Sequence, residues 1–127
     1  MRRMKCHEIS LKIKAWVECR GFALIGSGRG ALLDAIEEHG SISAAAKSLG
    51  LSYATAWHRL DSMNKAMGAP LVEPRSGGKG GGGTNLTERG RAVIKAFGFM
   101  QERIEEFRME TEKGIKAIIA DRNDQHE

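Results

Sequence analysis

The segment from Gly40 to Gly68 constrains the fold of this chain more than any other. It contains a short run with three consecutive alanines, a glycine at position 50, and then a longer run with helical periodicity. Small side chains let two helices approach closely, and glycine tolerates the backbone of a tight turn. An alanine-rich helix, a turn and a helix with a polar outer face together predict a helix-turn-helix unit.

Capping residues mark the ends of the predicted helices. Residues 29–39 form a first helix whose apolar face carries Leu32, Leu33 and Ile36. A short second helix runs from about residue 41 to residue 49, and a third follows over residues 53–67. The candidate caps of the second and third helices are Ser41, Ser43 and Ser52.

The third helix has an apolar and a polar face. Its apolar stripe is predicted to pack in the core and consists of Tyr53, Ala56, Trp57, Leu60, Met63 and Met67. Hydrogen-bonding side chains gather toward the N-terminal half of the other face, the end that a recognition helix presents to base edges. These are Ser52, Thr55, His58, Arg59 and Ser62. The alternative is a small helical domain whose third helix merely has a polar surface.

A glycine-rich stretch, "PRSGGKGGGGTNLT", follows the third helix and has six glycines in 14 residues. A flexible linker is one interpretation, but the apolar flanks with Leu71, Val72 and Leu86 favour two short strands around a glycine turn. In this position such a hairpin is the wing of a winged helix. Arg75 and Lys79 are its predicted phosphate contacts. A nucleotide-binding P-loop does not fit, because glycine and not Ser or Thr follows Lys79.

The N-terminal region predicts a strand. Over residues 8–18, apolar side chains at Ile9, Leu11, Ile13 and Ala15 alternate with mostly polar ones, which is the pattern of a half-buried strand. A second short apolar run, "FALIG", follows. The next motif, "GSGRGA", matches a dinucleotide-binding turn only formally and is better interpreted as the entry to the first helix.

Residues 87–120 predict one long helix. An apolar stripe with alternating four- and three-residue steps is typical of a coiled-coil seam and predicts a homodimer. Its members are Val93, Phe97, Met100, Ile104 and Phe107. We expect the first two turns of the stripe to pack on the chain's own domain. Residues 121–127 are predicted to be a flexible tail.

Charge and composition narrow the class of protein. With 127 residues, 41% hydrophobic and 28% charged, the chain is expected to form one globular domain with an appended helix. Residues 41–91 contain seven Lys and Arg against three Asp and Glu, which suits a nucleic-acid contact or an unevenly charged surface without a partner. No catalytic triad or metal cluster stands out, and the two cysteines lack metal-ligand spacing. We expect a cytoplasmic protein that is neither an enzyme nor a membrane protein.

The chain resembles a known family across residues 9–110. The pieces that carry the resemblance are "GSIS" before the alanines, "SYATAW" at the start of the third helix, "MN" near its end, and "GGKGGGG" followed by "LTERG". They are similar to the DNA-binding domain of ModE-type molybdate-responsive regulators, relatives of the LysR-type winged helices. The resemblance places Tyr53 with the residues that open the recognition helix.

The resemblance implies a mainly α fold with a small β content, a winged helix-turn-helix over residues 1–86 with an N-terminal strand, and a dimerisation helix over residues 87–120. It implies a dimeric regulator, a repressor of molybdenum-related genes, that binds a palindromic operator in double-stranded DNA. The alternative is a winged helix that docks a protein. The expected DNA contacts are Ser43, Ser52, Tyr53, Thr55, His58, Arg59, Arg75 and Lys79. Molybdate-binding domains follow the long helix in the family, so we expect no cofactor in these 127 residues. The effector domain is then a separate protein, or regulation uses another signal, or DNA binding is constitutive.

Overall fold

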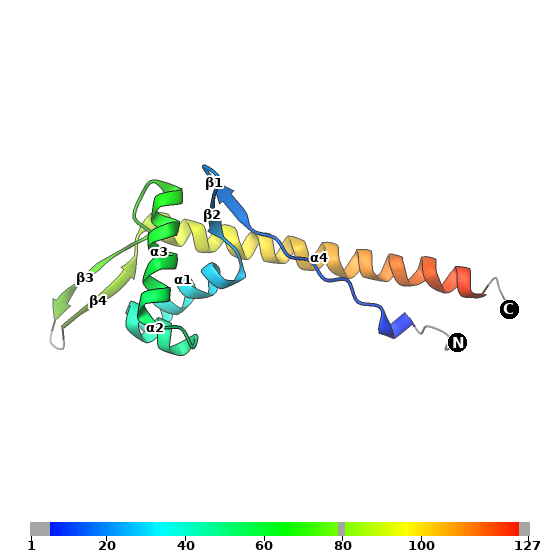
Figure 1. The fold of residues 1–127 in the computed structure, drawn as a ribbon, viewed down its shortest axis with the longest axis horizontal. Helices are drawn as coiled ribbons and strands as arrows, with labels where there is room; N and C mark the ends of the chain where they lie inside the picture. Colours follow the sequence, from blue (N-terminus) through cyan, green and yellow to red (C-terminus); the bar gives the residue numbers. More distant parts are fainter. Residues whose placement is uncertain (1–5, 79–80, 125–127) are drawn as a thin grey trace. The chain divides into compact units, whose positions relative to one another are not determined.

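The computed structural model describes residues 6–78 and 81–124 and divides the chain into two compact units. Residues 15–98 form one, and residues 1–14 together with 99–127 form the other. The chain is mainly helical with two small antiparallel sheets (Figure 1). The predicted fold class, a winged helix-turn-helix followed by a long helix, is confirmed. The unit boundary near residue 98 lies beyond the predicted domain boundary at residue 86.

Three helices of the first unit correspond to the three predicted ones. They are α1 (Ser27–His39), α2 (Ile42–Ser48) and α3 (Tyr53–Met67). Glycines with positive φ terminate α1 and α3, at Gly40 (φ 75°) and Gly68 (φ 71°). Such left-handed termini favour glycine because it has no Cβ to clash with the backbone. Serines cap α2 and α3, so local signals set these helix ends as the sequence predicts.

Each sheet of this unit is a two-stranded hairpin. Strand β1 (Val17–Cys19) pairs with β2 (Phe22–Ile25) through a turn in which Arg20 and Gly21 both have positive φ. Strand β3 (Val72–Gly78) pairs with β4 (Gly81–Leu86) after α3, in the place predicted for the wing. The register sets Val72 opposite Leu86 and the wing's Arg75 opposite Gly83.

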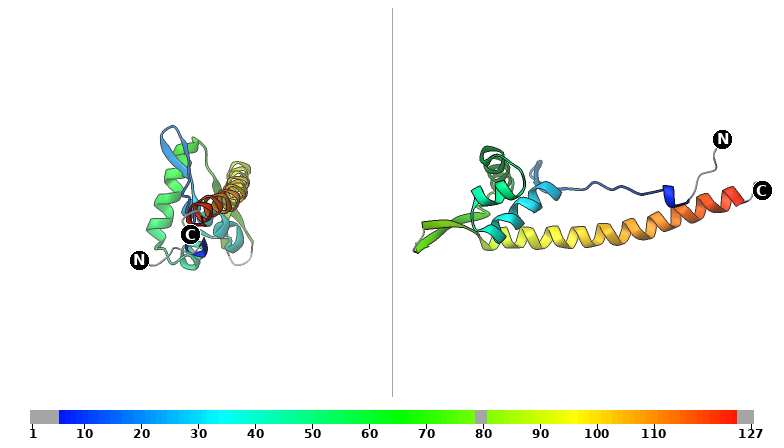
Figure 2. Two further views of the ribbon diagram at one scale, coloured as in Figure 1. Left: turned by 90° about the vertical axis from the view of Figure 1, so that its right-hand side faces the viewer. Right: turned by 90° about the horizontal axis from the view of Figure 1, so that it is seen from below.

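The helix α4 (Glu88–Asp124) begins in this unit and completes its core. Its side chains Val93 and Phe97 are 4% and 5% exposed. Gly30 of α1 leaves room for the Phe97 ring, because a Cβ at position 30 would overlap it. Helix α1 thus lies between α3 and the first turns of α4 (Figure 2). The other large apolar side chains of the described core are Leu24, Ile25, Leu32, Leu33, Ile36, Leu60, Met63, Leu71 and Leu86.

In the second unit, an N-terminal segment accompanies the distal part of α4. It contains a short 3-10 helix over Cys6–Glu8. Residues 9–14 of this segment, and residues 15–16 of the first unit, have no regular secondary structure. The predicted strand over residues 8–18 is therefore wrong except at its end, where β1 begins at Val17. Alternation shows which side chains face inward, but a strand also needs a neighbouring strand to accept its backbone hydrogen bonds. Here the Leu11 amide donates instead to the Glu112 carboxylate of α4, at 2.9 Å.

Candidate nucleic-acid interface

The turn between α2 and α3 brings these two helices together. Ala45 and Ala46 of α2 are 0% and 2% exposed, and Ala56 on the facing side of α3 is fully buried. Methyl groups at these positions allow the close approach that larger side chains would prevent. Gly50 has φ 67°, and the Leu51 amide donates to the Ala46 carbonyl at 2.9 Å. The result is the predicted helix-turn-helix geometry.

The N-terminus of α3 is held by Ser52. Its Oγ accepts a hydrogen bond from the Thr55 amide at 3.1 Å and donates one to the Thr55 hydroxyl oxygen at 2.9 Å. Both side chains are exposed, and so is Ser43 in the first turn of α2. The Thr55 hydroxyl keeps its own proton available for a further acceptor. The predicted polar residues at the start of α3 thus lie together on the surface.

The exposed side of α3 also carries two aromatic side chains. Tyr53 is 54% exposed and Trp57 is 45% exposed. The Trp57 and His58 rings meet edge to face, with centroids 5.6 Å apart and an interplanar angle of 81°. The prediction that Tyr53 and Trp57 belong to the core is therefore wrong. The core side of α3 is narrower than the apolar stripe in the sequence and consists of Ala56, Leu60, Met63 and Ala66.

Two cationic side chains on α3 have neighbours within the chain. Arg59 is half-buried, and its guanidinium lies beside Gly28 of α1, 3.5 Å from where a Cβ on that glycine would stand. Lys65 is exposed and forms an ion pair with Asp61 one turn earlier, at 2.9 Å. Asp61 therefore offsets the positive charge of Lys65 on this helix.

The wing is docked on the end of α1. The Thr84 amide donates to the Gly40 carbonyl at 2.8 Å. The Arg75 guanidinium lies next to the same glycine, within 3.2 Å of where its Cβ would stand. Arg75 is exposed but lies along the hairpin, opposite Gly83, and not at its tip. Lys79, the other predicted phosphate contact, lies outside the described residues.

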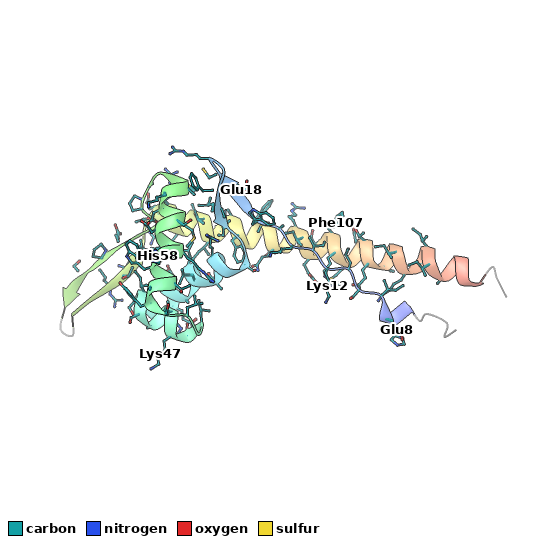
Figure 3. All side chains as sticks on the ribbon, viewed as in Figure 1. Glu8, Lys12, Glu18, Lys47, His58 and Phe107 are labelled. Atoms are coloured by element: carbon teal, nitrogen blue, oxygen red, sulfur yellow. The ribbon has the colours of Figure 1, made fainter. Side chains whose placement is uncertain are left out.

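Exposed lysines that the sequence interpretation did not select also lie on the helix-turn-helix unit. Lys47 of α2 projects outward, and it is labelled with His58 of α3 in Figure 3. It adds an exposed positive charge to α2, whereas the charge of Lys65 on α3 is offset by Asp61. The net positive charge of residues 41–91 was the sequence signal that could have pointed to these lysines. Charge alone does not tell which lysine faces a ligand.

The predicted dimerisation stripe divides between the two units. Val93 and Phe97 are buried in the core of the first unit, as expected for the first two turns of the stripe. Met100 and Ile104 are half-buried, and Phe107 is 61% exposed. The described part of the stripe that is available to another molecule therefore starts after residue 98.

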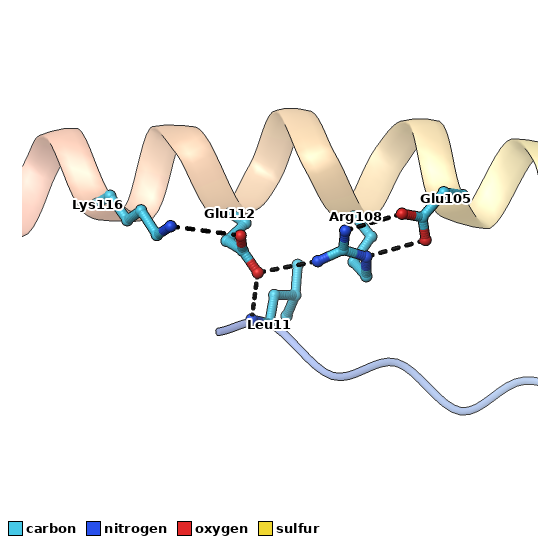
Figure 4. A network of polar contacts seen from close by, with 5 residues as sticks. All are labelled: Leu11, Glu105, Arg108, Glu112 and Lys116. Carbon is cyan, nitrogen blue, oxygen red and sulfur yellow. Dashed lines mark hydrogen bonds and ion pairs between the residues drawn. The ribbon is translucent and has the colours of Figure 1, made fainter. Parts of the chain in front are cut away.

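The distal part of α4 carries a chain of charged contacts (Figure 4). Arg108 pairs with Glu105 at 2.8 Å and with Glu112 at 2.9 Å, and Lys116 pairs with Glu112 at 3.5 Å. The hydrogen bond from the Leu11 amide, together with the charges of Lys116 and Arg108, lowers the pKa of Glu112 below its ordinary value. The hydrogen bond with Arg108 likewise lowers the pKa of Glu105. Of these contacts, the hydrogen bond from the Leu11 amide attaches the N-terminal segment to α4 within the second unit.

Other kinds of site find little support in the described residues. No group of three or more His, Cys, Asp and Glu side chains is arranged there to hold a metal ion. Among the buried side-chain nitrogen and oxygen atoms described, Arg29 Nε alone has no hydrogen-bond partner. No helix in the described ranges combines the length and apolar character that a membrane crossing requires.

Comparison with known sequences supports the fold and the family resemblance. Residues 31–91 match the sequence model of the bacterial regulatory helix-turn-helix proteins of the lysR family. The molybdenum-pterin-binding protein MopA of Rhodobacter capsulatus is 43% identical over 81 residues, which are 64% of this chain and 31% of MopA. The DNA-binding transcriptional dual regulator ModE of Escherichia coli is 42% identical over 71 residues, 56% of this chain and 27% of that protein. The resemblance to ModE-type regulators is thus confirmed, and the chain spans about a third or less of these relatives.

Solved structures agree on the architecture. The structure of the CbnR_DBD–DNA complex aligns with a TM-score of 0.52 at 24% identity and covers 75% of this chain and 99% of that one. At this identity the likeness shows the fold alone. The shared fold is the helix-turn-helix followed by a wing that is described above.

Proposed function

We propose that this chain, whose winged helix is of the ModE type, binds double-stranded DNA with sequence specificity and regulates molybdenum-related genes. The observation that carries the proposal is the exposed N-terminal half of α3, which presents Ser52, Thr55 and His58 in the same unit as the wing docked on α1. Hydrogen-bonding groups at this end of a recognition helix are those that reach base edges in the major groove.

The charge distribution supports DNA as the partner. Residues 41–91 carry seven Lys and Arg against three Asp and Glu. Phosphate attraction supplies the part of DNA affinity that does not depend on sequence, and it weakens as the salt concentration rises, because the release of counterions is then less favourable. A winged helix that docks a protein, the alternative function, has no such requirement. The relatives named as transcriptional regulators favour DNA.

The direct test separates contacts to phosphate from contacts to bases. Changing both Arg75 and Lys79 to Ala should weaken binding to all duplexes and reduce the slope of log affinity against log salt by about two. Changing Thr55 or Arg59 to Ala should instead reduce the preference for the selected duplex, by about 1–3 kcal/mol for each base that the side chain recognises. Fluorescence anisotropy on a duplex selected from random DNA measures both effects.

A charge-matched control uses lysines of α4. Replacing Lys95 and Lys113 with Ala removes the same two charges from exposed positions outside the helix-turn-helix and the wing. We expect this variant to keep most of the salt slope. If its slope falls as much as that of the wing variant, general charge and not the wing accounts for binding. If neither the wing changes nor the α3 changes alter duplex affinity, the DNA proposal is wrong and the protein-docking alternative is favoured.

The dimer and the effector complete the proposal. A homodimer through the distal part of the stripe, the half-buried Met100 and Ile104 and the exposed Phe107, would set two recognition helices on the half-sites of a palindrome. We assign no molybdate site to the described residues. An effector would then act through a domain outside these residues, on this or on a separate protein. Anisotropy with and without molybdate tests this, since an effect on the purified chain alone would contradict it.

A further inference from the structure

Tyr53 and Trp57 form an aromatic pair on the exposed side of the recognition helix. They are four residues apart on α3, and side chains at that spacing lie on the same helix face. They are 54% and 45% exposed, and Ala54 between them is exposed too. The edge-to-face contact with the His58 ring restricts how the Trp57 indole can turn. The start of α3 therefore presents apolar as well as hydrogen-bonding groups.

The core does not account for this pair. Helix α3 packs inward through side chains that are fully or almost fully buried, Ala56, Leu60, Met63 and Ala66. An exposed Trp and an exposed Tyr side by side on the surface of a small unit call for a partner that covers them. Their position at the N-terminal half of α3 is the position that base edges would occupy if the proposed function holds.

The chemistry of the major groove limits what an apolar side chain can meet there. Base faces are stacked inside the duplex, and the edges of adenine, guanine and cytosine present hydrogen-bond donors and acceptors. Thymine alone adds a methyl group, at C5. We therefore propose that Tyr53 and Trp57 recognise thymine methyl groups, so that each half-site contains at least one thymine opposite this pair. The inference rests on the proposed function and specifies the bases that the site selects.

Substitution of the DNA tests the proposal without disturbing the protein. The full chain is first used to select a duplex from random DNA. Each thymine of that duplex is then replaced singly by deoxyuridine, which lacks the methyl group and keeps its hydrogen-bonding groups. For the unaltered protein we expect affinity to fall about fourfold at each position where a methyl group is buried. Replacement of the other thymines should leave the affinity unchanged.

Protein variants identify the side chains that meet the methyl group. The Trp57→Ala or Tyr53→Ala variant should have the same affinity for duplexes with thymine and with deoxyuridine at the sensitive position. The salt concentration is chosen low enough for the variant still to bind. Tyr53→Phe keeps the ring and should keep the thymine preference. Phe22→Ala is the matched control, because Phe22 is an aromatic residue of similar exposure, 58%, that lies on β2. Circular dichroism checks that each variant is folded.

The outcomes distinguish a failure of the thymine inference from a failure of the proposed function on which it rests. If selection enriches no duplex, the proposed sequence-specific function fails and the inference fails with it. If a duplex is enriched but deoxyuridine binds as well as thymine at every position, the function stands and the thymine inference is overturned. A thymine preference that persists in both alanine variants also overturns it, because another side chain then meets the methyl group.

Discussion

Gly30 shows how a single missing side chain allows two helices to pack. A Cβ at this position would overlap the Phe97 ring, whereas a Cβ on Gly28 in the same helix would meet only Arg59 Nη1, at 3.5 Å. We expect Gly30→Ala to lower the free energy of unfolding by about 1–3 kcal/mol through overpacking. Gly28→Ala should leave it unchanged or raise it by up to about 1 kcal/mol, because alanine favours the helix. Urea unfolding measures both, and equal effects would contradict the assigned packing.

Glu112 makes the attachment of the N-terminal segment depend on pH. The pKa of its carboxyl is lowered from 4.5, mainly by the Leu11 amide. A group with a lowered pKa in the folded state stabilises that state fully above its ordinary value, and the contribution is lost as pH falls through the lowered value. We expect the Leu11 amide to lose hydrogen-exchange protection, relative to its intrinsic rate, as pH falls below 4.5.

Glu112→Gln is the control for this pH dependence. The amide side chain still offers an oxygen to the Leu11 amide but has no charge to lose. Leu11 protection should then be weaker near neutral pH and independent of pH in the acid range. An unaltered chain whose Leu11 protection stays constant on acidification would show that the carboxylate does not hold the segment.

Sequence patterns predicted the burial of some side chains correctly and of others wrongly, and Trp57 shows why. Periodicity places it at the edge of the apolar stripe of α3, next to positions that are buried. How wide the buried face is depends on the size of the neighbouring helices, which is a property of the folded unit. The alanines of α2 cover only a narrow part of α3, so the indole remains 45% exposed.

The wing depends on a backbone contact at the end of α1. A Cβ on Gly83 would overlap the Gly40 carbonyl, which accepts the hydrogen bond of the Thr84 amide, and would crowd the Arg75 guanidinium. Gly83→Ala should therefore undock the wing, lower the free energy of unfolding by about 1–3 kcal/mol and weaken DNA binding. Gly98→Ala is the control, because its Cβ would meet open space. Wild-type stability and DNA affinity in Gly83→Ala would contradict this role of the wing.

Helices and strands differed in how far local sequence determined them. The ends of α2 and α3 follow from serine caps and from the glycines at positions 50 and 68, which act within one or two turns. The wing was predictable because its apolar anchors flank a recognisable glycine turn. The N-terminal strand was not, since residues 9–16 alternate like a strand but have no strand to pair with. The Glu112 carboxylate of α4 accepts the hydrogen bond of the Leu11 amide instead.

At the scale of the whole molecule, the proposed dimer depends on the exposed part of α4. Phe107 is 61% exposed on the stripe, and Met109 is 59% exposed on a different face of the same helix. Phe107→Glu should raise the dimer dissociation constant at least tenfold, because burying a Phe side chain contributes about 1.5–3 kcal/mol. Met109→Glu introduces the same charge and should leave it unchanged.

Sedimentation across a concentration series gives the dissociation constants for this comparison. The wild-type chain should be dimeric at tens of micromolar, an order-of-magnitude choice suited to weak interfaces. A strictly monomeric wild-type chain at about that concentration would remove the role given to the stripe. Equal effects of the two glutamates would show that charge, and not the stripe, governs association.

The hydrogen bond from Thr84 to Gly40 has a consequence for variation in the length of the wing. Leu86, 1% exposed, follows Thr84 by two residues and shares its strand. One extra glycine inserted between Gly83 and Leu86 would leave the composition nearly unchanged, yet it would turn one of the two anchors to the opposite face of the strand. The segment after Gly83 therefore acts as a fixed-length spacer, and related chains can differ in its composition more readily than in its number of residues.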